Sequence, residues 1–309
     1  MVQYYSFNEV IGKIRNRSIQ FENSLKIKKI FKLNMLFSLS YLFHKKSYKH
    51  KINSILCGIL QEYDKQYSCN IEKKKIMEEK YNIWVMWWQG LQNMPPTIQA
   101  CYKQLKMSAG KYRIVLITKD NVQNYIEIPD VIKDKVHRGI MTQTALSDYV
   151  RVLLLKLYGG LWVDSSIYCL HEIGEIDKYF FYTGKKLGGR KWTSFLMATN
   201  ETGMELFARL EYYMRRYWQE YDVQFDYFFT DLLIEYLYRN DEEIHKIIDA
   251  VPENNQDIFT LLNILSEPYD ENTYKELQST HIFQKISQKK DFKLYKKKKP
   301  TYGNVLLRI

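Results

Sequence analysis

The stretch YGGLWVDSSIYCL, Tyr158 to Leu170, decides the fold class. Its two glycines end the preceding helix, because either can adopt the left-handed conformation that closes a helix. Three apolar residues then form a strand that leads directly to one acidic residue, Asp164, and two serines follow in place of a second carboxylate. A strand that ends in a lone carboxylate is typical of an α/β sheet with a ligand site at the strand's carboxyl end.

Strands and helices alternate on the amino-terminal side of this stretch. IWVMWW (Ile83 to Trp88) and YRIVLIT (Tyr112 to Thr118) are apolar runs of strand length, and LWV (Leu161 to Val163) is a third. A helix opens at Pro95-Pro96 between the first two strands, and another spans about Gln143 to Tyr158. The pattern predicts an α/β fold with an open, mainly parallel sheet flanked by helices.

The outer parts of the chain are predicted to be helical. Residues 1–75 form an N-terminal helical region, in which Lys26 to Lys46 is either a membrane-interface helix or a core helix, and His50 to Tyr67 is a second helix. Further helices are expected at 202–220 and 225–239. The remainder, 76–309, is predicted to be a single domain that ends in a basic tail.

The charge of the 309-residue chain is concentrated at its two ends. The net charge is +11, with nine Lys/Arg and one Asp/Glu in residues 281–309, whereas residues 81–280 carry 21 Lys/Arg and 27 Asp/Glu. Basic ends suit an anionic membrane surface, or they are a solvated surface that keeps the protein soluble. No nucleic-acid motif accompanies them, so we expect no nucleic-acid partner.

Cysteine spacing and hydropathy indicate the cellular location of the protein. The four cysteines show neither metal-ligand spacing nor a disulfide framework. We find no signal peptide and no apolar run long enough to span a bilayer. The sequence therefore predicts a cytoplasmic protein that is peripheral to the inner face of the membrane.

Polar residues follow each predicted strand, where the carboxyl ends should converge. The candidates are Trp87, Trp88, Gln89, Asp120, Asn121, Asp164 and Ser166. On the helix before the third strand, Asp148 and Arg151 are three residues apart and share one side. An acid and a base on a mostly apolar helix are either a buried structural ion pair or part of a site.

The run SDYVRVLLLKLYGGLWVDSSIY resembles the signature of the capsular polysaccharide synthesis glycosyltransferases, which are related to the sugar transferases with a DXD motif and a GT-A fold. The resemblance extends to IWVMWWQG and VLITKDNVQNYIEIP upstream, and to FDYFFTDLLIEYLY and THIFQKISQK downstream. It implies a GT-A-like retaining transferase that moves a hexose from a nucleotide sugar, with a leaning to uridine, to a growing lipid-linked glycan.

The resemblance also assigns roles to residues. Asp148 and Arg151 match positions that hold the donor sugar and diphosphate, and Ser147 stands beside them. Asp164 matches the first acid of the DXD element. Trp87 matches an aromatic residue that stacks on the nucleotide base, although a core tryptophan is the alternative and Trp88 could exchange roles with it.

Two further groups are candidates for contacts with substrate. His281, Lys285 and Lys289 are four residues apart, on one helical face or in a closing loop, and either add cations to the diphosphate or form a solvated basic face. Asp226, an acid inside an aromatic cluster, is either structural or an acceptor-side contact.

The DXD comparison bears on the cofactor. Ser166 stands where the second acid, normally a metal ligand, belongs. We therefore expect Mn²⁺ or Mg²⁺ to bind only weakly at Asp164 and Ser166, together with the donor. The alternative to an enzyme is a catalytically silent relative that binds glycan or membrane.

Overall fold

The computed structural model describes residues 45–68, 82–175, 179–181, 190–199, 205–252, 254 and 257–307. The stretch Lys26 to Lys46 lies outside these residues except for its last two. The boundary expected near residue 75 also falls outside them and stays a prediction. No helix within the described ranges is long and apolar enough to cross a membrane.

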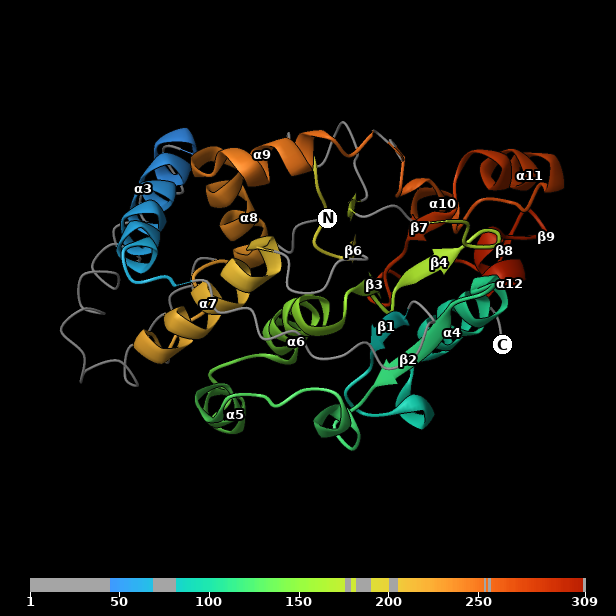
Figure 1. The fold of residues 1–309 in the computed structure, drawn as a ribbon. Helices are drawn as coiled ribbons and strands as arrows, with labels where there is room; N and C mark the ends of the chain where they lie inside the picture. The colour runs from blue at the N-terminus through green and yellow to red at the C-terminus, as the bar shows by residue number, and fades with distance from the viewer. Residues whose placement is uncertain are drawn as a thin grey trace.

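A five-stranded sheet of order β2-β1-β3-β6-β5 forms the centre of the protein (Figure 1). β2 and β3 run parallel to β1, β6 runs antiparallel to β3, and β5 runs antiparallel to β6. Four of the five strands therefore point the same way, which confirms the open, mainly parallel α/β sheet. The strands are β1 (Asn82–Met86), β2 (Arg113–Ile117), β3 (Gly160–Val163), β5 (Tyr179–Phe181) and β6 (Leu196–Thr199).

Helices flank this sheet. The helices expected from about His50, from Pro95-Pro96, over about Gln143 to Tyr158, at 202–220 and at 225–239 are present, with bounds that differ by a few residues at most. Figure 1 shows α3, α7, α8 and α9 gathered toward one side and α10, α11 and α12 toward the other. The helices are α3 (Lys45–Asp64), α4 (Pro96–Ser108), α5 (Asp130–His137), α6 (Gln143–Tyr158), α7 (Glu205–Glu220), α8 (Phe229–Asn240), α9 (Glu242–Asp249), α10 (Thr260–Ile264), α11 (Glu271–Thr280) and α12 (Tyr302–Leu307).

The junction between α6 and β3 fixes the position of Asp164. The hydroxyl of Thr142 caps α6 by accepting a hydrogen bond from the Ala145 amide, and Gly159 ends the helix with φ of 63°. At Gly160, with φ of 95°, a β-carbon would lie 2.4 Å from the carbonyl oxygen of Asn82. A glycine is therefore required for β3 to lie against β1.

A second, two-stranded sheet lies next to the end of β3. β4 (Ile167–Cys169) pairs antiparallel with β7 (Phe283–Lys285), and Ile167 stands opposite Lys285. The expected helical face or loop over residues 281–289 is thus wrong for its first half, because the backbone of β7 forms strand hydrogen bonds with β4. The chain then turns back as a short hairpin of β8 (Tyr295–Lys296) and β9 (Lys299–Pro300).

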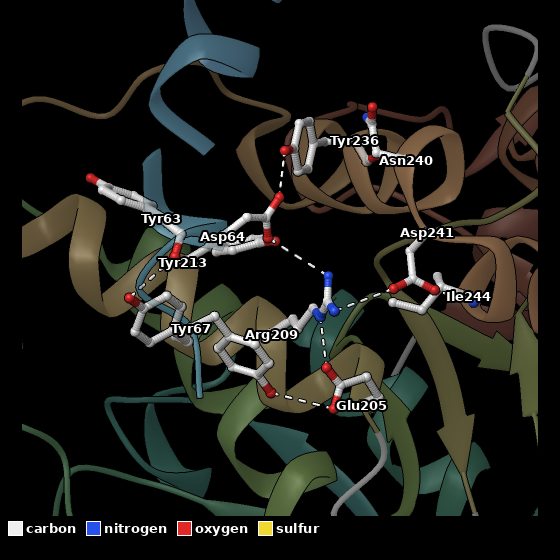
Figure 2. A network of polar contacts seen from close by, with 11 residues as sticks. Tyr63, Asp64, Tyr67, Glu205, Arg209, Tyr213, Tyr236, Asn240, Asp241 and Ile244 are labelled. Atoms are coloured by element: carbon white, nitrogen blue, oxygen red, sulfur yellow. Dashed lines mark hydrogen bonds and ion pairs between the residues drawn. The ribbon is translucent and has the colours of Figure 1, made fainter. Parts of the chain in front are cut away.

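Helix α3 is held on α7 and α8 by a polar network around Asp64 (Figure 2). Its carboxylate accepts hydrogen bonds from the hydroxyls of Tyr213 and Tyr236, and Arg209 lies 3.6 Å away. Arg209 also pairs with Glu205 at 2.6 Å, within α7. Because the three helices share this network, the described part of the N-terminal region is an integral layer of the fold.

Candidate functional site

Asp164 directly follows β3 and is held by three donors from three parts of the chain. One carboxylate oxygen accepts from the Trp162 indole at 2.8 Å and from Arg151 at 3.1 Å. The other accepts from the ammonium of Lys285 at 2.9 Å. The Asp164 amide donates to the Phe195 carbonyl, so the backbone is also fixed. The sequence analysis had named Asp164, Arg151 and Lys285 as separate candidates, and it had not singled out Trp162.

Arg151 connects Asp164 to Asp148. The same guanidinium nitrogen that contacts Asp164 lies 2.9 Å from Asp148 Oδ1, and another donates to the Ser194 carbonyl. The guanidinium also lies over the Trp162 ring, 5.1 Å from its centroid. The expected Asp148–Arg151 pair is therefore present, and it is joined to the acid at the strand end.

Burial affects the two carboxyl groups differently. It raises the pKa of Asp148 to about 6, because the opposing effect of Arg151 is smaller. Burial would also raise the pKa of Asp164, but Lys285 and Arg151 together outweigh it and hold the pKa below its usual value. The fold therefore stabilises the ionised form of Asp164 and destabilises the ionised form of Asp148.

Asp231 on α8 is a buried acid of the same cluster that sequence reasoning missed. It is 7% exposed, accepts a hydrogen bond from the Ser194 hydroxyl at 3.0 Å, and has its pKa raised by burial. The buried hydroxyl of the adjacent Thr230 is close enough to lower the pKa of Asp148, yet no hydrogen bond of acceptable geometry joins the two. The local sequence gave no signal for Asp231, because α8 carries a second acid, Glu235, and the contact of Asp231 with Ser194 spans 37 positions.

Tyr227 is a second residue that the sequence did not single out. Its ring is 72% exposed, and partial desolvation and then the carboxylates of Asp148 and Asp164 raise its pKa. It lies edge-to-face on Phe228, itself 50% exposed, with ring centroids 5.0 Å apart. Two exposed aromatic rings therefore stand beside the charged cluster, at the start of α8.

The aromatic candidates at the end of β1 differ in their surroundings. Trp88 packs against the main hydrophobic core, whereas the Trp87 indole donates to the Asn93 carbonyl at 3.1 Å. The Gln89 amide donates to Gln143 at the start of α6, 2.7 Å away. Trp87 is thus the better placed of the two for a ligand, and a stacking role stays a prediction.

The remaining candidates near the strand ends occupy turns and helix surfaces. Asn121 uses its side chain within the turn after β2, accepting from Thr118 and donating to Leu116, and Asp120 beside it is exposed. Ser147 and Ser166 are half-buried next to Asp148 and Asp164. Donor contacts by these four residues stay predictions.

The three basic candidates near the C-terminus do not converge on one place. Lys285 enters the cluster, whereas His281 lies at the other end of β7, and Lys289 is exposed in the turn beyond it. Asp226 accepts a hydrogen bond from the Phe228 amide at 2.8 Å and so shapes the turn before α8. An acceptor-side role for Asp226 stays a prediction.

A divalent ion at Asp164 and Ser166 also stays a prediction, but the ligands suit it poorly. Both oxygens of Asp164 already have partners, and a serine hydroxyl is a weak ligand. Within the described ranges, no three His, Cys, Asp or Glu side chains are grouped so as to hold a metal. An ion at Asp164 would therefore have to share the carboxylate with Arg151 and Lys285 or displace one of them.

Comparison with known proteins finds a matching protein family. A model of the family described as "Capsular polysaccharide synthesis protein" matches residues 9–305. The chain is also 23% identical over 122 residues to "O-glycosyltransferase braB" of Annulohypoxylon truncatum and 28% identical over 111 residues to "O-glycosyltransferase PaGT" of Phomopsis amygdali. These matches cover 37% and 33% of this chain, but only 29% and 27% of the two relatives.

Among solved structures, "PaToxG Glycosyltransferase" aligns with 63% of this chain and 83% of its own. The TM-score is 0.37 at 11% sequence identity. That level of agreement is too low for an argument about the site. The family match over residues 9–305 is the comparison on which identification rests.

Proposed function

The chain belongs to the capsular polysaccharide synthesis family, and we propose that it is a glycosyltransferase. The observation that carries the proposal is the cluster of Asp148, Arg151, Asp164 and Lys285 at the end of β3. Fixed cations and carboxylates at one place are what the transfer of a sugar from a diphosphate requires. The proposed donor is a hexose linked to UDP, and the proposed fold type is GT-A.

The chemistry assigns each charge a task. The bond between the anomeric carbon and the diphosphate oxygen breaks, and its electron pair leaves with the diphosphate. A bond to an acceptor hydroxyl oxygen forms, and the leaving diphosphate takes up the hydroxyl proton. Arg151 and Lys285 meet the charge that develops on the diphosphate, while Asp148 and Asp164 orient the sugar and stabilise positive charge on its ring. We propose that the anomeric configuration is retained.

The exposed rings of Tyr227 and Phe228 provide a proposed acceptor side. Tyr227 is near enough to Asp148 and Asp164 for both carboxylates to raise its pKa, and sugar rings offer the apolar faces that exposed aromatic surfaces contact. Asp226, in the same turn, is a further proposed acceptor contact, because a carboxylate can accept hydrogen bonds from sugar hydroxyls. The proposed acceptor is a lipid-linked oligosaccharide of a capsule or other surface polysaccharide.

A membrane-bound acceptor agrees with the basic C-terminal segment. Lys297 and Lys298 form the exposed tip of the β8–β9 hairpin, next to Tyr295, which is 57% exposed. Clustered lysines with an interfacial aromatic residue favour the surface of an anionic bilayer. We propose that this hairpin contributes to peripheral attachment at the inner membrane face.

The test is hydrolysis and transfer by the purified protein with a panel of UDP-hexoses, and the anomer of the product would be read by NMR. Without acceptor, slow hydrolysis to free sugar and UDP is expected; with a lipid-linked acceptor, UDP should be released faster and the sugar should appear on the acceptor. The alternative is a catalytically silent relative, which the replacement of the second DXD acid by Ser166 favours. Nucleotide binding without any turnover of a donor would support that alternative.

A further inference from the structure

The position of Lys285 is determined by strand pairing. Lys285 lies opposite Ile167 in the β4–β7 ladder, and its backbone amide donates to the Ile258 carbonyl at 2.7 Å. The backbone amide of the next residue, Ile286, donates to the Ser166 carbonyl at 2.9 Å. The backbone of β7 is thus bonded directly to Ser166. The ladder brings a cation beside the residue that replaces the second acid of the motif.

The side chain of Lys285 is as constrained as its backbone. It is 18% exposed, its ammonium lies 2.9 Å from Asp164 Oδ2, and it lies 4.9 Å from the centroid of the Phe195 ring. Asp164 Oδ1 is occupied by the Trp162 indole and Arg151. A metal ligated by Asp164 would have to share the carboxylate with these two cations, which repel it, or displace one of them and leave a largely buried cation without its partner.

We propose that Lys285 takes the place of a divalent metal in this protein and that the diphosphate of the donor binds to Lys285 and Arg151 without Mn²⁺ or Mg²⁺. The inference rests on the proposed function, because it concerns how the same site holds a nucleoside diphosphate. Asp164 acts as the anchor that keeps the ammonium in place, as a metal-ligating acid would keep the ion. The serine at position 166, where the DXD motif has its second acid, and the ammonium of Lys285 are then two parts of one arrangement.

The charges of the described groups agree with this arrangement. Arg151 and Lys285 supply two positive charges, close to what a divalent ion supplies, while Asp148 and Asp164 balance them before the donor arrives. Arg151 can also offer a further donor, since its buried Nε has no hydrogen-bond partner within the described residues. Phosphate oxygens suit such a donor, because charge-assisted hydrogen bonds are strong when the guanidinium is held rigid.

The experiment measures the binding of UDP, GDP and ADP to the full chain by calorimetry, in excess EDTA and in excess Mn²⁺. The proposal expects at least one of these nucleotides to bind with the same affinity in both buffers. An affinity that falls about tenfold or more in EDTA would overturn the proposal while the proposed transferase function stands. No binding of any of the three in either buffer would overturn both.

Variants test the lysine itself. Lys285→Met should weaken nucleotide binding by about tenfold or more in EDTA, since a charge-assisted contact is lost, and Lys285→Arg should restore most of it. Lys293→Met, which removes an exposed lysine eight residues later, is the matched control and should bind as the parent does. Equal binding by the parent and a folded Lys285→Met protein would refute the proposal.

A charge exchange completes the test. In the double variant Ser166→Asp with Lys285→Met, the second acid is restored and the competing cation is removed. The affinity for the nucleotide should then depend on Mn²⁺. The electron paramagnetic resonance signal of free Mn²⁺ should also decrease when the double variant is added, because the variant binds the ion. If manganese leaves the double variant's nucleotide affinity unchanged, Lys285 does not occupy the role of the metal.

Discussion

The pH dependence of the free energy of unfolding measures how much stability the fold loses when the buried carboxyl group of Asp148 is ionised. Burial raises the pKa of Asp148 from 3.8 to about 6. Below pH 3.8 the carboxyl is protonated in both the folded and the unfolded chain, and above pH 6 it is ionised in both. Between these values the folded protein binds the proton more tightly, so the free energy of unfolding falls as pH rises.

The expected magnitude follows from the size of the shift. About two pKa units, at about 1.4 kcal/mol each, give a loss of about 3 kcal/mol between pH 4 and pH 7. The side chain is only 15% exposed, so solvent screening reduces this value little. Asp164 does not interfere, because its pKa is lowered and its stabilising contribution is lost only as pH falls below 3.8.

The assay compares urea unfolding of the parent and Asp148→Asn at several pH values from 4 to 7.5. The variant lacks the titrating group, so the free energy of unfolding of the parent should fall relative to it by about 3 kcal/mol across this range. Asp130→Asn, at an exposed carboxylate, controls for the loss of one negative charge. Parallel curves for the parent and Asp148→Asn would refute the account of a costly buried carboxylate.

Three further changes test the proposed function and the membrane contact. Arg151→Lys should lower sugar transfer by about 100-fold in a protein that still folds, because an ammonium cannot make the contacts of the planar guanidinium; full activity with Lys and unfolding with Ala would favour a purely structural pair. Tyr227→Ala should raise the KM for the acceptor about fivefold, the equivalent of about 1 kcal/mol of lost ring contact, and leave donor hydrolysis unchanged; an unchanged acceptor KM would exclude Tyr227 from the acceptor side. Replacing Lys296 to Lys299 with Gln should weaken binding to anionic vesicles by about 1 kcal/mol for each lysine near the surface, and equal binding would rule out the hairpin as an attachment site.

Local pattern was enough to predict α6 and the strand before Asp164, but not β7, which carries Lys285. The bounds of α6, Gln143–Tyr158, agree with those read from apolar spacing and the glycine pair, because a capped amphipathic helix is encoded by residues near one another. β1 is shorter than the apolar run suggested and ends at Met86. Trp87 and Trp88 lie beyond it. An apolar run cannot show where a strand ends when aromatic residues continue into the turn that follows.

Contacts between distant segments could not be predicted in the same way. Lys285 reaches Asp164 across 121 positions of sequence because β7 pairs with β4 in one register. A shift of that register by one residue would turn the lysine to the opposite face. Asp231 and Ser194 were missed for the same reason: their hydrogen bond spans 37 positions, and neither residue is unusual in its local sequence.

The charge cluster is better explained by function than by stability. A buried ion pair contributes little net stability, because desolvation of the charges offsets their attraction. Here the imbalance is visible within one cluster, since the pKa of Asp148 is raised although Arg151 lies 2.9 Å away. Buried donors of Arg151 and Thr230 also find no hydrogen-bond partner among the described residues. Well-packed apolar residues in place of such a pair would avoid these desolvation costs. Groups held at such a cost at the end of a strand, where α/β sheets bind ligands, are expected to find their missing partners in a substrate. A diphosphate that accepts hydrogen bonds from Arg151 and Lys285, while Asp164 still anchors the ammonium, would be such a partner.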